Sequence, residues 1–216
     1  ASRWWLHHAL TDLDQSIGAQ GSKLVISAGH AAEELPKITQ VHQADIILYG
    51  RCYDPAGIAT QEAVEEACDI HGIATESFNS SLLQEPWETK NGTGNPFQVF
   101  TPYWRKSRPI IYREPASYDP RKLSFAKGIS SPSSLAELDL LPQHPWHQKL
   151  GNHWEVSEAA AHQQIERTVE EVTQSYATRR NHPSVDGPSR LSPYLTWGQV
   201  SPRQICQAVL QAENEG

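Results

Sequence analysis

Methionine is absent from the 216-residue chain, and cysteine is scarce, with three residues. A reading frame normally opens with methionine, so we expect the chain to be a piece of a longer protein. Cys52, Cys68 and Cys206 are odd in number, lie far apart and form no Cys-x-x-Cys pair. A disulfide framework or a zinc site is therefore not expected. Idle thiols in a reducing cytoplasm are the better interpretation.

Long apolar runs and an excess of positive charge are also missing. No stretch approaches the ~20 apolar residues that a membrane-spanning helix requires, so no membrane partner is expected. The 18 basic side chains are outnumbered by 25 acidic ones, which gives a net charge of −7. Proteins that bind nucleic acid by themselves usually carry a basic face. Most contacts with DNA phosphates, if there are any, must therefore come from groups outside this chain.

Apolar runs alternate with helical patterns through the first 78 residues. Apolar positions at helical spacing predict helices over 2–17, 31–43 and 60–71. Short apolar runs predict buried strands at 23–27, 45–49 and 73–78. Apolar strands that alternate with helices are typical of a parallel sheet with helices on both faces. The fold class predicted for this part is therefore α/β and Rossmann-like.

Residues 79–153 hold most of the chain's 15 prolines and few periodic runs. A connection this long needs tertiary contacts to stay ordered. Aromatic side chains are candidates for these contacts, namely Trp87, Phe97, Phe100, Tyr103 and Trp104. We predict an ordered interdomain segment with one short helical turn near 133–138.

From Ser157 onward the pattern is helical and contains no strand signal. Ser157 is a suitable N-cap for a helix that runs to about Tyr176 or Arg179, and a polar loop follows. Ser201 and Gln204 have the spacing of a capping box, with a proline between them at the first helical position. The chain is therefore expected to be α/β first and all-α later.

Two short motifs resemble ligand sites but lack essential parts. The segment 91–96 contains Gly-x-Gly without the third glycine of a dinucleotide-binding turn, and it does not lie between a strand and a helix. His144, His147 and His153 have no carboxylate or thiol partner at a metal-binding spacing. We interpret the first as a turn, and we assign no metal-ligating and no catalytic residue.

The polar segment that ends at Ser192 offers more. Gly187 permits a tight turn. Ser189 and Ser192 offer hydroxyl donors, and Arg190 offers a planar cationic fork. With the amides of a nearby helix start, these groups could hold a diphosphate. The alternative is that they only cap helices, and their chemistry alone leaves both interpretations open.

The same segment begins a resemblance that covers the whole chain. Ser189-Arg190-Leu191-Ser192-Pro193, Trp197-Gly198 and Ser201-Pro202-Arg203-Gln204 resemble the flavin-loop signature of class I photolyases and their cryptochrome relatives. Further similar stretches are Ser2-Arg3-Trp4-Trp5-Leu6, Ser77-Phe78-Asn79, Glu85-Pro86-Trp87, Pro96-Phe97 through Trp104, Leu141-Pro142, Pro145-Trp146 and Trp154. Each stretch is short, and their common register makes the resemblance specific.

The resemblance implies an α/β antenna domain at 1–104, a linker at 105–150 and the start of an all-α FAD-binding domain at 151–216. The opening strands and most of the helical domain are then missing. It also implies a monomeric, cytoplasmic deoxyribodipyrimidine photo-lyase. In such an enzyme, excited reduced FAD passes an electron to a cyclobutane pyrimidine dimer flipped out of DNA and receives it back. The piece alone is expected to be inactive.

Particular residues acquire roles through the same resemblance. It implies that FAD is contacted by Tyr176, Pro188, Ser189, Arg190, Leu191 and Ser192, and that DNA is contacted by Arg180. Pro188 replaces a usual threonine, which removes a hydroxyl and an amide donor. The segment 49–55, with Thr60 and Gln61, replaces polar residues of the family's antenna domain. Whether methenyltetrahydrofolate or 8-hydroxy-deazaflavin binds there stays open.

Two other functions stay open. A cryptochrome-like photoreceptor would bind FAD and signal through partners instead of repairing DNA, and the residues that separate the two lie largely outside this chain. A free-standing nucleotide-binding α/β domain is the third possibility. The helical region with its Ser-Arg-Leu-Ser loop argues against that possibility.

Overall fold

The computed structural model describes residues 1–111, 123–179, 181–182, 184–185 and 187–215. The chain divides into two compact units, each made of two stretches of sequence. The first unit holds Ala1–Ser80 and Pro120–Trp154, and the second holds Ser81–Asp119 and Glu155–Gly216. The division therefore falls twice within the predicted interdomain segment. The domain boundaries at 104 and 150 remain predictions.

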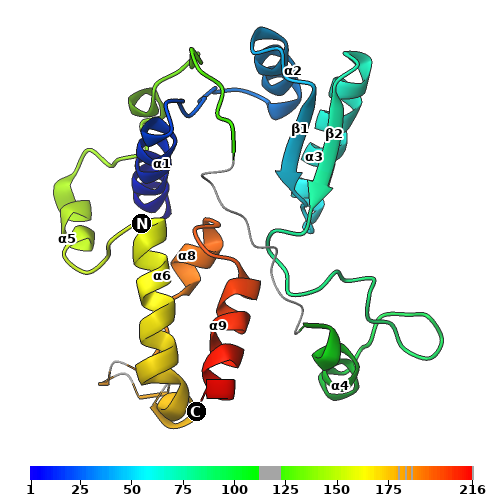
Figure 1. Ribbon diagram of the computed structural model, residues 1–216, viewed down its shortest axis with the longest axis vertical. Helices are drawn as coiled ribbons and strands as arrows, with labels where there is room; N and C mark the ends of the chain where they lie inside the picture. Colours follow the sequence, from blue (N-terminus) through cyan, green and yellow to red (C-terminus); the bar gives the residue numbers. More distant parts are fainter. Residues whose placement is uncertain (112–122, 180, 183, 186, 216) are drawn as a thin grey trace. The chain divides into compact units, whose positions relative to one another are not determined.

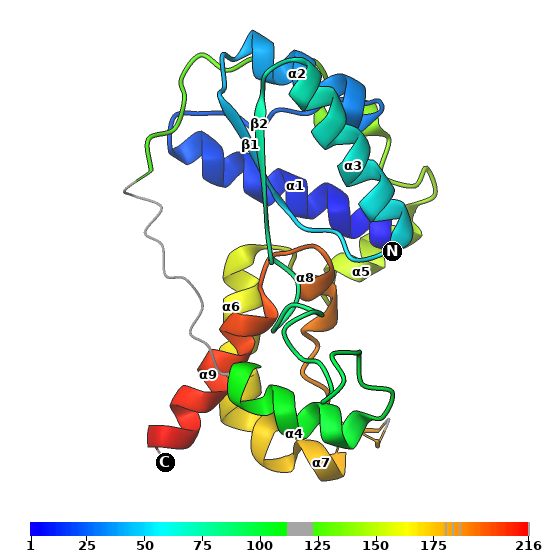
Figure 2. The same cartoon turned by 90° about the vertical axis from the view of Figure 1, so that its right-hand side faces the viewer.

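A two-stranded parallel sheet and three helices organise the first unit (Figure 1). Strands β1 (Ile46–Gly50) and β2 (Ala74–Phe78) pair so that Ile46 lies opposite Ala74. The three long helices are α1 (Ser2–Ala19), α2 (Ala31–Val41) and α3 (Pro55–Ile70). Helices α2 and α3 lie side by side, and α3 also contacts β2 (Figure 2). The predicted α/β class with a parallel sheet is confirmed.

Helix α3 begins five residues earlier than its apolar pattern predicts. Asp54 is its N-cap, and the carboxylate accepts a hydrogen bond from the backbone N–H of Gly57 at 2.9 Å. Pro55 follows at the first helical position, where its missing N–H costs no hydrogen bond. The cap and the proline therefore set the start of the helix, and the apolar face begins later.

The predicted strand at 23–27 is wrong, because its only strand-like feature is an isolated antiparallel bridge between Ile26 and Ser133. The N–H of Leu24 donates to the carboxylate of Asp14 at 3.0 Å. The N–H of Ile26 donates to the hydroxyl of Ser131 at 2.7 Å. Side chains and a distant loop satisfy these amides instead of a neighbouring strand. An apolar run predicts burial, but it cannot name the hydrogen-bond partner.

Tryptophans tie the start of the first unit to its end. Trp4 and Trp5 are buried in α1. The Trp5 ring meets Trp154 edge-on, with ring centroids 5.3 Å apart. Three short helices precede Trp154 in the chain. They are the 3₁₀ turns Leu135–Leu138 and Pro145–His147, and α5 (Gln148–Gly151). The first of these confirms the predicted turn near 133–138.

The regular secondary structure in the described residues of the second unit is all helical, and loops connect its helices. It contains α4 (Phe100–Ile111), α6 (Glu158–Arg167), α7 (Tyr176–Arg179), α8 (Ser192–Thr196) and α9 (Pro202–Glu215). Both predicted caps are confirmed. The Ser157 hydroxyl accepts from the N–H of Ala160 at 2.9 Å. Ser201 and Gln204 exchange both bonds of a capping box, at 2.7 and 3.2 Å.

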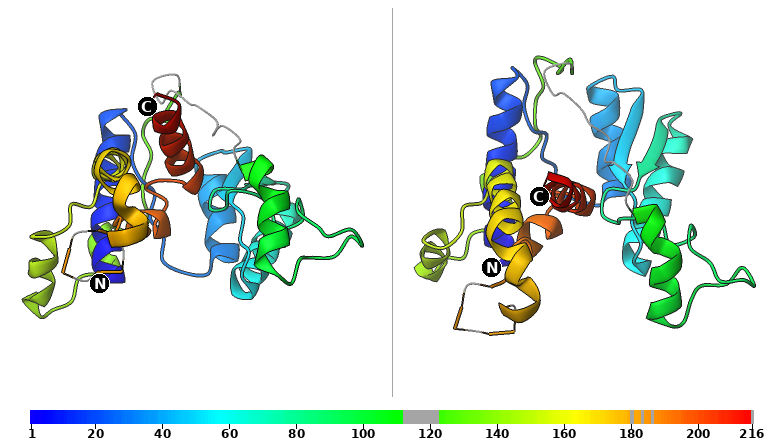
Figure 3. Two further views of the ribbon diagram at one scale, coloured as in Figure 1. Left: turned by 90° about the horizontal axis from the view of Figure 1, so that it is seen from below. Right: turned by 60° about the horizontal axis from the view of Figure 1, so that its bottom comes forward.

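Helix α4 was not predicted, because two prolines interrupt its pattern. Pro102 lies in the first turn, where proline is tolerated, and Pro109 lies in the last turn. The helix predicted from Ser157 to about Tyr176 or Arg179 is present as an unbroken helical run, but its helix type changes. Helix α6 ends at Arg167 and continues as a π-helical turn at Thr168–Val172, a 3₁₀ turn at Thr173–Ser175 and then α7 (Figure 3).

β-Branched residues with internal hydroxyl bonds account for that change of helix type. The Thr168 hydroxyl donates to the Gln164 carbonyl at 2.6 Å, and the Thr173 hydroxyl donates to the Val169 carbonyl at 2.7 Å. Such bonds to the residue four positions back bend helices, and β-branched side chains crowd the preceding turn.

None of the helices in the described residues is both long and apolar enough to cross a membrane.

Candidate functional site

The loop from Gly187 to Ser192 begins against the end of α7. Gly187 is buried, and a Cβ atom placed on it would lie 2.7 Å from the carbonyl oxygen of Arg179. Backbone therefore approaches backbone at a distance that only glycine allows. The close approach of the two backbones is therefore a specific structural reason for glycine at 187, and the tight turn stays a prediction.

Arg190 turns the loop through an unusual backbone conformation. Its φ of +55° lies in the left-handed region, which non-glycine residues rarely adopt. After this turn Leu191 is only 3% exposed, whereas Arg190 and Ser192 on either side are exposed. The left-handed turn therefore buries one apolar side chain and directs the two polar ones to the surface.

The backbone carbonyl of Ser189 attaches the loop to α6. The carbonyl oxygen of Ser189 accepts a hydrogen bond from Nε2 of Gln164 at 2.8 Å. It also lies 3.4 Å from the hydroxyl of Thr168, which is buried. Beyond the loop, the Tyr194 hydroxyl donates to the Glu155 carbonyl at 2.7 Å. Burial raises the pKa of Tyr194, so its phenol remains a neutral donor.

The predicted FAD residues fall into two neighbouring groups. Pro188, Ser189, Arg190, Leu191 and Ser192 form the loop itself. Tyr176 begins α7, the short helix whose last residue contacts Gly187, and it is 40% exposed. The predicted DNA contact Arg180 lies outside the described residues.

The accessible donors suit an anionic ligand. Arg190 offers a guanidinium group, and Ser189 and Ser192 offer hydroxyl groups. Leu191 anchors the loop by burial. This donor set fits the diphosphate of a dinucleotide such as FAD.

Gln164 and Thr168 were missed by the sequence analysis, although their spacing of four residues on one helix places them on a common face.

Polar side chains also gather at the carboxyl ends of β1 and β2, where they bond to one another. The Arg51 guanidinium donates through Nη2 to the Ser77 carbonyl at 2.8 Å and through Nε to the Ser77 hydroxyl at 3.1 Å. The Tyr49 hydroxyl donates to the Glu65 carboxylate. Burial, reinforced by that bond, raises the pKa of Tyr49 to about 12.

Gln61 extends this cluster in both directions. Its amide nitrogen donates to Glu65 at 3.0 Å, and its amide oxygen accepts from the N–H of Cys52 at 3.2 Å. Carboxyl ends of parallel strands are the usual ligand-binding edge of an α/β sheet. Here Arg51, Gln61 and Glu65 are engaged with protein partners, so the cluster offers a ligand few free donors.

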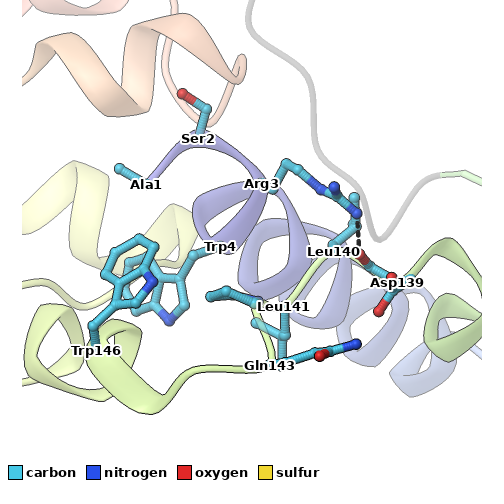
Figure 4. Close-up of a pocket in the computed structure, with 10 residues that line it drawn as sticks. Ala1, Ser2, Arg3, Trp4, Asp139, Leu140, Leu141, Gln143 and Trp146 are labelled. Atoms are coloured by element: carbon cyan, nitrogen blue, oxygen red, sulfur yellow. Dashed lines mark hydrogen bonds between the residues drawn. The ribbon is translucent and has the colours of Figure 1, made fainter.

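A cavity of about 410 Å³ opens beside the start of α1 in the first unit (Figure 4). Its walls include the indoles of Trp4 and Trp146 and the segment from Asp139 to Gln143. The Arg3 guanidinium donates to the carbonyl of Asp139, so this cation is already paired with the wall. The described residues contain no group of three or more His, Cys, Asp or Glu that could hold a metal ion.

Comparison with known proteins gives one consistent family. A sequence profile described as DNA photolyase matches residues 1–120. A deoxyribodipyrimidine photo-lyase of Agrobacterium fabrum is 30% identical over 96% of this chain and 44% of its own length. Cryptochrome-2 of Arabidopsis thaliana is 29% identical over 96% of this chain and 35% of its own length. The chain thus spans less than half the length of these curated relatives.

Solved structures give the same result. A bacterial class III photolyase from Agrobacterium tumefaciens superposes with a TM-score of 0.87 at 30% identity, over 96% of this chain and 43% of that one. A Synechocystis cryptochrome superposes with a TM-score of 0.83 at 22% identity, over 99% of this chain and 45% of that one. The second likeness concerns the fold alone.

Proposed function

The chain belongs to the DNA photolyase family, and on that premise we propose that the whole protein repairs cyclobutane pyrimidine dimers in DNA with light and bound FAD. The carrying observation is the loop from Gly187 to Ser192. Its Ser189 carbonyl is bonded to α6, the Arg190 and Ser192 side chains are exposed, and Ser189 is half-buried. A fixed loop with outward donors holds a diphosphate without first having to be ordered.

The loop residues have distinct tasks in this proposal. Arg190 supplies the cationic fork, and Ser189 and Ser192 supply hydroxyl donors to the FAD diphosphate. Leu191 is the buried anchor, Pro188 fixes the entry to the loop, and Tyr176 contributes from α7. Bound FAD supplies the light-driven electron transfer, while the protein binds it, orients it and excludes water.

Light-driven repair by the full-length protein tests the proposal. FAD-loaded protein, reduced and illuminated with blue light, should restore an oligonucleotide that contains a cyclobutane dimer, and dark samples should not. A matched substrate with a 6-4 photoproduct tests the lesion type. Protein that holds FAD but leaves the dimer intact in the light would overturn repair.

A cryptochrome-like photoreceptor is the second candidate, because cryptochrome relatives match the chain over nearly its whole length. The same assay separates the two, since a photoreceptor binds FAD without repair. We propose class I from the resemblance of the flavin-loop motif, whereas a solved structure with 30% identity to this chain is a class III photolyase. Binding of a methenyltetrahydrofolate or deazaflavin antenna also stays a proposal. The polar cluster at the strand ends does not favour it, because Arg51, Gln61 and Glu65 already bond to protein partners.

We propose that the 216-residue chain alone does not retain FAD. The described contacts offer one loop, and a few hydrogen bonds do not offset the cost of immobilising a large cofactor. The purified chain should therefore be colourless after desalting. Stoichiometric flavin in the desalted chain would contradict this.

DNA binding through Arg180 is likewise proposed from the family pattern. A phosphate contact positions the duplex without reading its sequence. In the full-length protein, Arg180→Ala should weaken damaged and undamaged DNA alike and lower the salt slope by about one counterion. Arg167→Ala is the control, because Arg167 pairs with Glu171 at 3.1 Å. Fluorescence anisotropy at several salt concentrations measures the DNA affinity and its salt dependence for both variants. If Arg180→Ala changes neither quantity, Arg180 does not contact DNA.

A further inference from the structure

We propose that Gln164 is a positioning residue for the FAD loop, with Thr168 in a weaker supporting role. The inference rests on the proposed function and assigns part of it to α6, outside the loop motif. Gln164 holds the loop through one bond, from its Nε2 to the carbonyl oxygen of Ser189 at 2.8 Å. It therefore acts through the loop backbone and not on the cofactor.

The geometry of the peptide bond explains what this contact achieves. A trans peptide is planar, and its carbonyl and N–H point in opposite directions. With the Ser189 carbonyl fixed toward α6, the N–H of Arg190 must point away from α6. The left-handed φ of +55° at Arg190 then turns the chain, so that Leu191 is buried and Ser192 is exposed. One side-chain amide thus sets the orientation of the donors that follow.

Distances rank the side chains of Gln164 in α6 and of Thr168, the residue that follows α6. The Thr168 hydroxyl lies 2.6 Å from the Gln164 carbonyl but 3.4 Å from the Ser189 carbonyl. A hydroxyl carries one proton, so its main bond is the internal one and its contact with Ser189 is weak. Gln164 is therefore the principal tether. Thr168 contributes mostly by bending the helix where the π-helical turn begins.

The contact cannot be ascribed to helix stability alone. The amide of Gln164 bonds to a residue 25 positions away, so it adds nothing to the hydrogen bonds within α6. Loss of this bond should free the loop and leave α6 formed. FAD would then have to order the loop on binding, which weakens affinity without changing the contacts that FAD makes.

Replacement of the amide in the full-length protein tests the proposal. Gln164→Met keeps the length and removes the donor, whereas Gln164→Lys restores a donor. Gln163→Met makes the same change at the exposed neighbouring position. We expect Gln164→Met to raise the FAD dissociation constant about twofold to tenfold, the value of one neutral hydrogen bond. Gln164→Lys should recover most of the FAD affinity, and Gln163→Met should bind FAD as tightly as wild type. Thr168→Val should change the FAD dissociation constant by less than about threefold.

Hydrogen exchange of the apoprotein supplies a readout that does not depend on FAD. In Gln164→Met, the amides of 187–192 should exchange faster, while α6 keeps its protection. If Gln164→Met fails to fold, Gln164→Glu carries the same comparison, because its carboxylate has the same length and no donor for the Ser189 carbonyl. Equal FAD affinity and equal loop exchange in wild type and Gln164→Met would overturn the positioning role. Wild-type protein that binds no FAD would instead overturn the proposed function.

Discussion

The unit that holds the parallel strands and the unit that holds the Gly187–Ser192 loop use their polar side chains in opposite ways. At the strand ends, Arg51, Gln61 and Glu65 bond to protein partners of the same unit. In the loop, the Ser189 backbone carbonyl is bonded to Gln164 of α6, and the Ser192 side chain is exposed. The comparison teaches that the strand ends, although the more familiar binding edge, use Arg51, Gln61 and Glu65 for bonds within the unit, whereas the loop is held to α6 by its backbone.

Replacement of a glycine by alanine is expected to give the largest difference between the units in the free energy of unfolding. Gly187→Ala places a Cβ atom 2.7 Å from the Arg179 carbonyl, so the backbone of the loop or of α7 must shift. We expect a loss of about 1–3 kcal/mol in the free energy of unfolding. Gly18→Ala in α1 meets no atom within 4 Å and should stabilise by up to about 1 kcal/mol.

Urea denaturation of both glycine variants measures these effects. A Gly187→Ala protein as stable as wild type would show that the loop is not held against α7. The contrast between the units would then lose its geometric basis.

The capping box of α9 gives a smaller effect. Ser201→Ala removes the hydroxyl that accepts from the N–H of Gln204, and should cost about 1 kcal/mol. Thr196→Ala is the control, because that hydroxyl only donates back to the Ser192 carbonyl within α8. Asp54→Ala removes the corresponding cap of α3 in the first unit. In thermal unfolding, the melting temperatures of Ser201→Ala and Asp54→Ala should be similar, and both should lie below that of the Thr196→Ala control.

Pro188 tests whether the loop depends on its entry residue. Pro188→Thr in the full-length protein restores a hydroxyl and an amide donor, worth about 0.5–1.5 kcal/mol if either reaches the cofactor. FAD affinity should therefore be equal or up to about tenfold higher. Fluorescence titration of released flavin measures it. A marked loss of FAD would show instead that the fixed φ of proline shapes the loop.

Tyr49 gives the smallest effect and probes the self-bonded cluster of the first unit. Its pKa is raised to about 12, first by burial and then by the bond to Glu65, so the fold favours the neutral phenol. Its contribution to stability is complete below about pH 10 and is lost as the pH rises toward 12. Tyr49→Phe should flatten this alkaline loss. Unfolding curves between pH 9 and 12 test this, and parallel curves for the two proteins would contradict it.

The sequence determined the local features whose causes lie within a few residues. The caps at Ser157 and Ser201 were predictable because a hydroxyl and the amide it bonds are three positions apart. The strands at 45–49 and 73–78 were predictable because short apolar runs alternate with helical patterns. The short motifs around Ser189 and Trp197 indicated the family, since their register along the whole chain is specific even where each piece is weak.

Only the tertiary structure decided which distant groups meet. The run at 23–27 is apolar enough for a strand, but Asp14 and Ser131 satisfy its amides. The spacing of Gln164 and Thr168 could not identify the partner of Gln164, because that partner is the Ser189 carbonyl, a backbone group that every residue has. Patterns in sequence report burial and local hydrogen bonds, whereas a contact across 25 residues depends on how the intervening turns place the two segments.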